Sequence, residues 1–173
     1  MPFDQQDCYQ LATDWISRFN DSITLPQNRR IRVESLFLKN SFWRDALGLT
    51  WKIETYSGSR DITSTIIEST TKIGLSNLQL DDDASSPQWV NRAGTDAIEA
   101  FIKFETKNAN GRGIIRLCEA TKKVDKYADG PQWRAWTFFT AIDSLKDYHK
   151  QIDRNRSIGL SYSRNFRGPN WLD

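Results

Sequence analysis

Residues 41–56 constrain the fold more than any other part of the chain. In an extended strand, successive side chains point to opposite faces. One face of this segment would carry Trp43, Asp45, Leu47, Leu49, Trp51 and Ile53. Burying a lone carboxylate is costly, so an acid among tryptophans and leucines predicts a residue that lines a pocket or has a specific partner. The alternative is that Asp45 lies at a strand end, solvated or paired with Arg44 or Arg134.

Composition narrows the class of protein. The chain has 173 residues, the length of one ordinary domain. Its 24 basic and 22 acidic residues leave a net charge of +2, without the basic excess of a nucleic-acid-binding protein. We expect neither a nucleic-acid partner nor a membrane partner, because no apolar run approaches membrane-spanning length. The two cysteines, Cys8 and Cys118, indicate reduced core residues of a cytoplasmic protein.

Hydrophobic spacing predicts helices over residues 5–20, 31–38 and 59–69. Alternating segments predict strands over residues 41–47, 49–57, 75–80, 97–106, 114–120 and 132–142, with residues 108–113 as a hairpin connection. The first two segments, on either side of Gly48, are alternatively one bent strand. This order predicts an α+β fold in which helices pack on one side of a strongly curved antiparallel sheet. We expect one domain over residues 1–145, followed by a polar, irregular tail over residues 146–173.

Several cofactor motifs are missing from the sequence. It has no glycine-rich loop between a strand and a helix, because Gly111 and Gly113 lie between two predicted strands. It has no cluster of residues with metal-ligand spacing, and its one histidine, His149, lies in the predicted tail. We therefore expect no cofactor and no metal in this chain itself.

Several short motifs resemble one known family. They are Trp43-Arg44-Asp45, Leu49-Thr50-Trp51, FIKFET at 101–106, RGIIRL at 112–117, WRAWTFFT at 133–140 and NWLD at 170–173. Their order is similar to the nuclear-transport-factor-2-like (NTF2-like, or SnoaL-like) cone, and more closely to the N-terminal cone domain of fungal and bacterial FAD-dependent monooxygenase-like proteins. In that family a flavin domain follows the tail. The resemblance therefore implies FAD and NADPH only if such a domain lies downstream.

The resemblance also implies a pocket between helices and curved sheet, and small relatives of the cone include isomerases, dehydratases and polyketide cyclases. By this resemblance Asp45 is the candidate general base. The candidate residues around a small apolar or aromatic ligand are Trp43, Trp51, Tyr56 and Trp136. Arg116 and Arg134 are candidates for holding an oxyanion or neutralising Asp45.

Three functions follow as hypotheses. The chain is an accessory pocket or dimerisation domain of a flavin monooxygenase-like protein, a stand-alone isomerase, cyclase or dehydratase, or a non-catalytic ligand-binding module. The last predicted strand is aromatic on both faces, with Trp133, Ala135, Thr137 and Phe139 opposite Arg134, Trp136 and Phe138. Because one set must be covered by something else, we also expect a homodimer.

Overall fold

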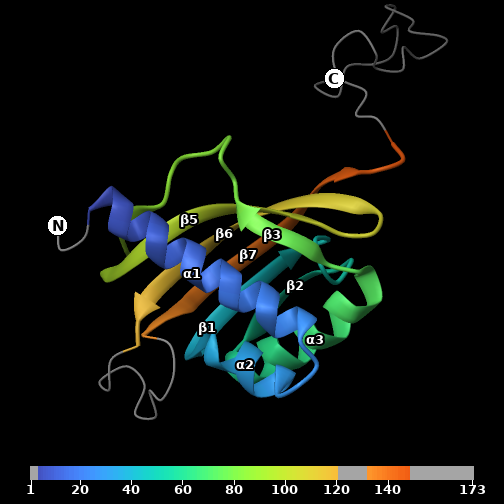
Figure 1. Cartoon of the computed structure of the whole chain (residues 1–173), viewed down its shortest axis with the longest axis horizontal. Helices are drawn as coiled ribbons and strands as arrows, with labels where there is room; N and C mark the ends of the chain where they lie inside the picture. The colour runs from blue at the N-terminus through green and yellow to red at the C-terminus, as the bar shows by residue number, and fades with distance from the viewer. Residues whose placement is uncertain (1–3, 121–131, 149–173) are drawn as a thin grey trace, which may run out of the picture.

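A computed structural model describes residues 4–120 and 132–148 and confirms the predicted α+β fold. The helices are α1 (Gln5–Thr24), α2 (Arg29–Ser35) and α3 (Ser59–Ile73). The strands are β1 (Phe37–Ala46), β2 (Ile53–Ser57), β3 (Ser76–Leu80), β4 (Gln88–Arg92), β5 (Thr95–Glu105), β6 (Ala109–Glu119) and β7 (Trp133–Leu145). The helices cover one face of a single curved sheet (Figure 1).

The strand order is β2-β1-β7-β6-β5-β3, and β4 also pairs with β5. Every pairing is antiparallel except that of β1 with β7, which is parallel. This parallel pair is the one departure from the expected antiparallel sheet. It places the first strand of the chain beside the last described strand.

The number of predicted helices is correct, but the ends of the helices differ from the predicted ends for local reasons. A capping box starts α1, in which the Asp4 carboxylate accepts from the Asp7 backbone at 2.8 Å and the Asp7 carboxylate accepts from Asp4 at 3.3 Å. Helix α2 begins and ends earlier than predicted, because Phe37 already belongs to β1. Helix α3 continues to Ile73, where Gly74 takes a left-handed conformation at φ 62° and ends it.

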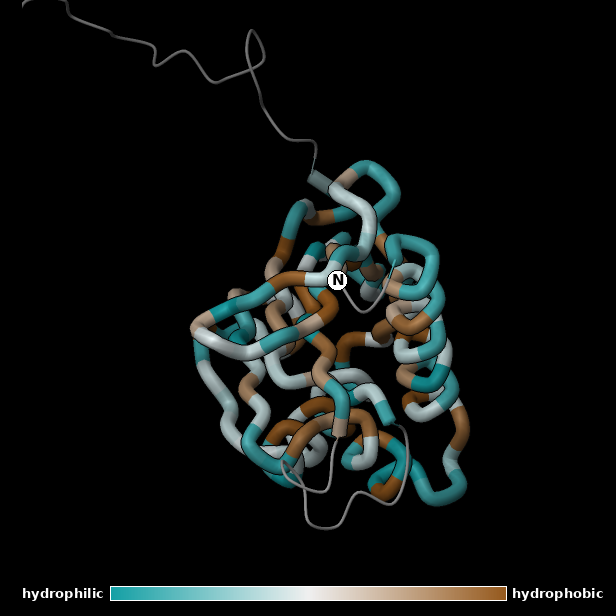
Figure 2. The backbone as a smooth tube through the Cα atoms, turned by 90° about the vertical axis from the view of Figure 1, so that its left-hand side faces the viewer, coloured by the Kyte–Doolittle hydropathy of each residue, from teal (hydrophilic) through white to brown (hydrophobic). Residues whose placement is uncertain are grey.

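An aromatic cluster fills the centre of the space between the helices and the sheet. Its members are fully or almost fully buried: Trp15, Phe19, Phe37, Trp43 and Phe138. Trp15 stacks on Phe19 with ring centroids 5.3 Å apart, and its indole N–H donates to the Leu36 carbonyl at 3.0 Å. Hydrophobic segments accordingly gather inside the molecule, and hydrophilic segments form the outer loops (Figure 2).

We call the sheet face that the helices cover the inner face, and the opposite one the open face. Paired residues share a face, so Trp43, Phe138, Ile115 and Ala100 form one inner row across β1, β7, β6 and β5. The adjacent open-face row contains Arg44, Phe139, Ile114 and Phe101. Phe42 and Phe139 are 47% and 36% exposed on this open face.

The predicted division of the last strand into two faces is wrong, and the reason is a β-bulge. Arg116 pairs with Thr137, but Leu117 pairs with Ala135, so Trp136 is the extra residue. Before the bulge, Trp133 and Ala135 belong to the inner core; after it, Thr137 and Phe139 lie on the open face. Strict alternation cannot reveal such a change of face.

Two further boundaries differ from the predictions. Strand β4 was not predicted, and β6 begins at Ala109, so most of the predicted connection at 108–113 is strand.

No helix in the described residues is long and apolar enough to cross a bilayer. The predicted tail lies largely outside the described residues, and the domain boundary at residue 145 stays a prediction.

Candidate functional site

A six-residue loop, residues 47–52, joins β1 to β2 where the sequence predicts continuing strand. Leu47 and Trp51 both take left-handed backbone conformations, with φ 63° and 57°. Such conformations are strained for residues with bulky side chains, unlike glycine, and persist only where the surroundings enforce them. The Leu47 N–H donates to the Lys52 carbonyl at 2.9 Å and closes the loop. This reversal ends the alternation after Asp45.

The buried carboxylate of Asp45, at the end of β1, holds this loop in place. Asp45 is 0% exposed. Its Oδ1 accepts from the backbone N–H groups of Gly48 at 3.1 Å and Leu49 at 3.0 Å. Its Oδ2 accepts from the backbone and the hydroxyl of Thr50 at 2.8 and 2.6 Å. A Cβ at position 48 would lie 2.9 Å from Asp45 Oδ1, so the arrangement requires glycine there.

The same carboxylate ties the loop to β7. The hydroxyl of Thr140 donates to Asp45 Oδ1 at 2.6 Å and accepts from the Trp43 indole N–H at 2.8 Å. Five donor groups therefore share a carboxylate with about four lone-pair sites. Asp45 does lie at a strand end, as the alternative held, but it is buried and its partners are neutral. Arg44 donates instead to Thr55 at 2.9 Å.

A hollow of about 250 Å³ lies between this loop and α3, and we call it the Trp51 hollow. Its lining residues are Leu49, Thr50, Trp51, Lys52, Tyr56, Thr65, Glu68, Ser69, Lys72 and Ile73. Leu49 is buried and anchors the loop in the core, whereas Trp51 is 48% exposed. The loop therefore presents an indole at the edge of the hollow.

Tyr56 forms a second aromatic surface in the Trp51 hollow. Its ring stacks on Trp43 with centroids 4.9 Å apart, and its hydroxyl donates to Glu54 Oε2 at 2.9 Å. Burial, followed by that hydrogen bond to Glu54, raises the pKa of the Tyr56 phenol. Tyr56 is therefore a neutral hydrogen-bonding group at neutral pH. Across the hollow, Lys72 and Glu68 form an exposed ion pair at 2.6 Å.

The structure separates the predicted site residues into two groups. Trp51 and Tyr56 line the Trp51 hollow, with Trp43 and Asp45 directly behind them. Arg116, Arg134 and Trp136 lie on the open face of the sheet instead. One pocket that contains all of them therefore does not form, because the sheet stands between the groups.

The open-face arginine Arg116 has a carboxylate partner of its own. Glu99 is 4% exposed, and it accepts from Arg116 Nε at 2.7 Å and from Arg92 at 2.8 Å. The hydrogen bond from Arg92, together with Arg116, lowers the pKa of Glu99. Trp136 packs beside Cys118, whose thiol pKa is raised to about 11 by burial. Glu99 and its two arginines therefore form an ion network in which Arg116 already has a carboxylate partner.

Sequence reasoning did not identify two residues that contact Asp45. Thr50 and Thr140 both lie in motifs of the resemblance, but those motifs do not show that either residue meets Asp45, which is 95 residues from Thr140 in the chain. Within residues 4–120 and 132–148, no three His, Cys, Asp or Glu side chains lie close enough to hold a metal ion.

Comparisons with known proteins define the class of fold. No family model matches this chain, and no curated protein does. An NTF-2 like protein of unknown function from Pseudomonas aeruginosa matches 78% of this chain and 97% of its own, with a TM-score of 0.51 and 4% identity. This chain therefore has the NTF2-like fold.

Two other solved structures are also similar. A candidate scytalone dehydratase from Novosphingobium aromaticivorans has 13% identity and a TM-score of 0.49, over 88% of this chain and 91% of its own. A steroid delta-isomerase from Pseudomonas aeruginosa has 10% identity and a TM-score of 0.44, over 83% and 84%. The comparisons give no support for the finer resemblance to flavin monooxygenases, which stays a prediction.

Proposed function

We propose that this NTF2-like chain binds a small aromatic or apolar molecule in the Trp51 hollow. One observation carries the proposal: the Asp45 carboxylate fixes residues 47–52 so that Trp51 is held half exposed in a strained conformation beside a hollow. Strain of this kind is frequently retained at ligand-binding sites. In this proposal Asp45 is a positioning residue and Trp51 is the contact residue.

The dimensions and chemistry of the hollow limit the ligand. A volume of about 250 Å³ suits a molecule with one or two rings. The indole of Trp51 and the ring of Tyr56 offer apolar surface, and the Tyr56 hydroxyl offers one polar contact. Both lysines of the lining already have a carboxylate partner, Lys72 with Glu68 at 2.6 Å and Lys52 with Glu54 at 3.8 Å, so a neutral ligand is favoured over an anion.

The test is an NMR titration with indole, phenol and cyclohexanol. We expect saturable shifts that are confined to residues 49–56 and to α3. Trp51→Ala should weaken binding about tenfold, in line with the loss of one buried aromatic contact. Ile53→Ala is the matched control, because Ile53 is an exposed hydrophobic residue next to the loop but outside the hollow. Equal effects of the two substitutions would contradict the proposal.

A second candidate function is isomerase, cyclase or dehydratase chemistry with Asp45 as general base. The observation in its favour is a carboxylate fully buried on the inner face beside Trp43 and Thr140. Its five donors must first be displaced, so this function requires the loop to open. Deuterium exchange at the γ-carbon of a small enone, where a base removes a proton to give a dienolate, tests it: a rate that Asp45→Asn leaves unchanged would exclude this role.

We further propose that the open face pairs with a second copy of the chain. Phe42 and Phe139 expose aromatic surface there, beside the partly buried Phe101 and Ile114. An exposed aromatic patch on a sheet is typical of an interface. The accessory role in a flavin monooxygenase-like protein, with its FAD and NADPH, also stays a proposal, supported by the sequence motifs alone.

A further inference from the structure

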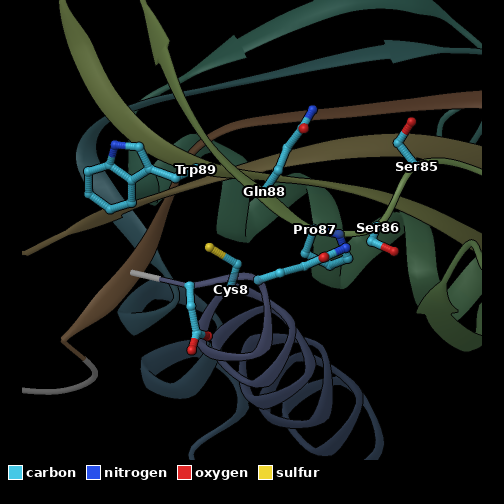
Figure 3. A pocket seen from close by; sticks show the side chains of 8 residues that line it. Cys8, Ser85, Ser86, Pro87, Gln88 and Trp89 are labelled. Atoms are coloured by element: carbon cyan, nitrogen blue, oxygen red, sulfur yellow. The ribbon is translucent and has the colours of Figure 1, made fainter. Parts of the chain in front are cut away.

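A second and larger hollow lies at the start of α1, which we call the Cys8–Trp89 hollow. It has a volume of about 440 Å³, within the range typical of small-molecule sites. Its lining residues are Asp4, Gln5, Cys8, Ser85, Ser86, Pro87, Gln88 and Trp89. Cys8 projects from α1 towards the segment that carries residues 85–89 (Figure 3). None of these residues lines the Trp51 hollow.

One wall of this hollow is a fixed aromatic side chain. Trp89 pairs with Ile98, which pairs with Leu117, so its indole lies on the inner face of the sheet. Its ring meets Trp133 edge to face, with centroids 6.2 Å apart and an interplanar angle of 78°. Trp133 is itself buried, and this contact restrains Trp89. Pro87 and the buried Cys8 add apolar surface.

The charge of the lining is one-sided. Among the described residues that line it, Asp4 is the single charged one, and none of them is a lysine or an arginine. Asp4 Oδ1 accepts from the Asp7 backbone, while Oδ2 makes no hydrogen bond within the described residues. Asp7 places a second carboxylate in the same helical turn, and the two acids outweigh the partial positive charge of the helix start. The described lining and the helix start beside it therefore carry a net negative charge.

We infer that the Cys8–Trp89 hollow binds a small organic cation with an apolar body, such as an aryl-alkyl ammonium. Tryptophan is the side chain that attracts a cation most strongly through its ring face. Asp4 supplies the opposite charge, and Pro87 and Cys8 face the apolar body. An anion would find no basic side chain among the described lining residues. This inference is independent of the function proposed for the Trp51 hollow.

The test compares three probes with the same ring: benzyltrimethylammonium, benzyl alcohol and phenylacetate. In NMR titrations of the full chain we expect saturable binding of the cation, with shifts at the Cys8 amide and the Trp89 indole. It should bind about five- to tenfold more tightly than the alcohol, and phenylacetate should be weakest. Added salt should weaken binding of the cation and leave the alcohol unaffected. No saturable shift at about 10 mM cation, or phenylacetate binding as tightly, would overturn the inference.

Two substitutions on α1 separate charge from structure. Asp4→Asn removes the charge and keeps an equally good N-cap, so the helix start is preserved. It should weaken binding of the cation about fivefold and leave the alcohol unchanged. Asp14→Asn is the matched control, because Asp14 is an exposed acid on the same helix that does not line the hollow. Equal affinities of wild type and Asp4→Asn for the cation would overturn the inference.

Discussion

Two buried carboxylates on opposite faces of one sheet are satisfied in different ways. Asp45, on the inner face, accepts hydrogen bonds from neutral backbone and hydroxyl groups and shapes a loop. Glu99, on the open face, lies between the guanidinium groups of Arg92 and Arg116. The Asp45 carboxylate sets the geometry of the loop, and the loop donors depend on it as their acceptor. The Glu99 carboxylate belongs to a charge network, and its arginine side chains can be hydrated when Glu99 is replaced. Replacing Asp45 and replacing Glu99 should therefore lower the free energy of unfolding by different amounts.

The largest effect is expected for Asp45→Asn. The amide keeps the size of the carboxylate but points an N–H₂ group at donors of Gly48, Leu49, Thr50 or Thr140. We expect the free energy of unfolding in urea to fall by about 3 kcal/mol, because buried donors lose their acceptor. The exposed Asp14→Asn should stay within about 0.5 kcal/mol of wild type. A loss as small as that control would remove the structural role given to Asp45.

A smaller loss is expected for Thr140→Val, which removes the hydroxyl between Trp43 and Asp45. Both Trp43 Nε1 and one carboxylate oxygen lose a partner, at about 1.5–2 kcal/mol. Thr140→Ser keeps the hydroxyl and removes only a methyl group, so it should cost less, about 1 kcal/mol. Thermal or urea unfolding of the Thr140→Val and Thr140→Ser variants measures this difference in stability. Greater damage from serine would show that packing, not hydrogen bonding, dominates at this position.

Glu99→Gln should cost about 1 kcal/mol, since Arg92 is half exposed and can be hydrated. The informative readout is pH. The pKa of Glu99 is lowered in the folded chain, so its contribution is present above the usual carboxyl pKa and is lost as pH falls through the folded value. Wild type should therefore lose its advantage over Glu99→Gln below about pH 4. A constant difference between the two proteins from pH 7 to pH 3 would contradict this.

The smallest effect on the folded monomer is expected for Phe42→Lys, which changes the open face without touching the core. If that face pairs with a second copy, sedimentation should show a wild-type dimer at micromolar concentration and a monomeric variant. Ile31→Lys is the control, since Ile31 is also an exposed apolar residue, at 69% against 47% for Phe42, but lies on α2. A monomeric wild type at that concentration would contradict the proposed pairing.

The parts of the fold that follow local periodicity were predictable. The helical spacing of Cys8, Ala12, Trp15 and Phe19 places α1 correctly at its start, and the fold class follows from the order of elements. The parts that depend on distant partners were not. The bulge at Trp136 and the parallel pairing of β1 with β7 leave no periodic trace in the sequence.

For the candidate site, the alternation pattern correctly identified Asp45 as a carboxylate on an apolar face. Its role depends on features that the alternation pattern does not contain. The chain turns back at Leu47 through a left-handed conformation, so Leu49 and Trp51 no longer share a strand face with Asp45. The donors of the loop and of Thr140 become visible only once the chain is folded. Whether Asp45 also takes part in chemistry stays a prediction.

The parallel pairing of β1 with β7 also sets an order of events during synthesis. Asp45 and Thr140 are separated by 95 residues, so at roughly 5–20 residues per second the ribosome makes the second about 5–20 s after the first. During that interval β1 has no β7 beside it, and Trp43 lacks the hydroxyl that its indole bonds in the finished fold. The sheet can therefore close only after β7 has been made, and this long-range pairing predicts slow folding.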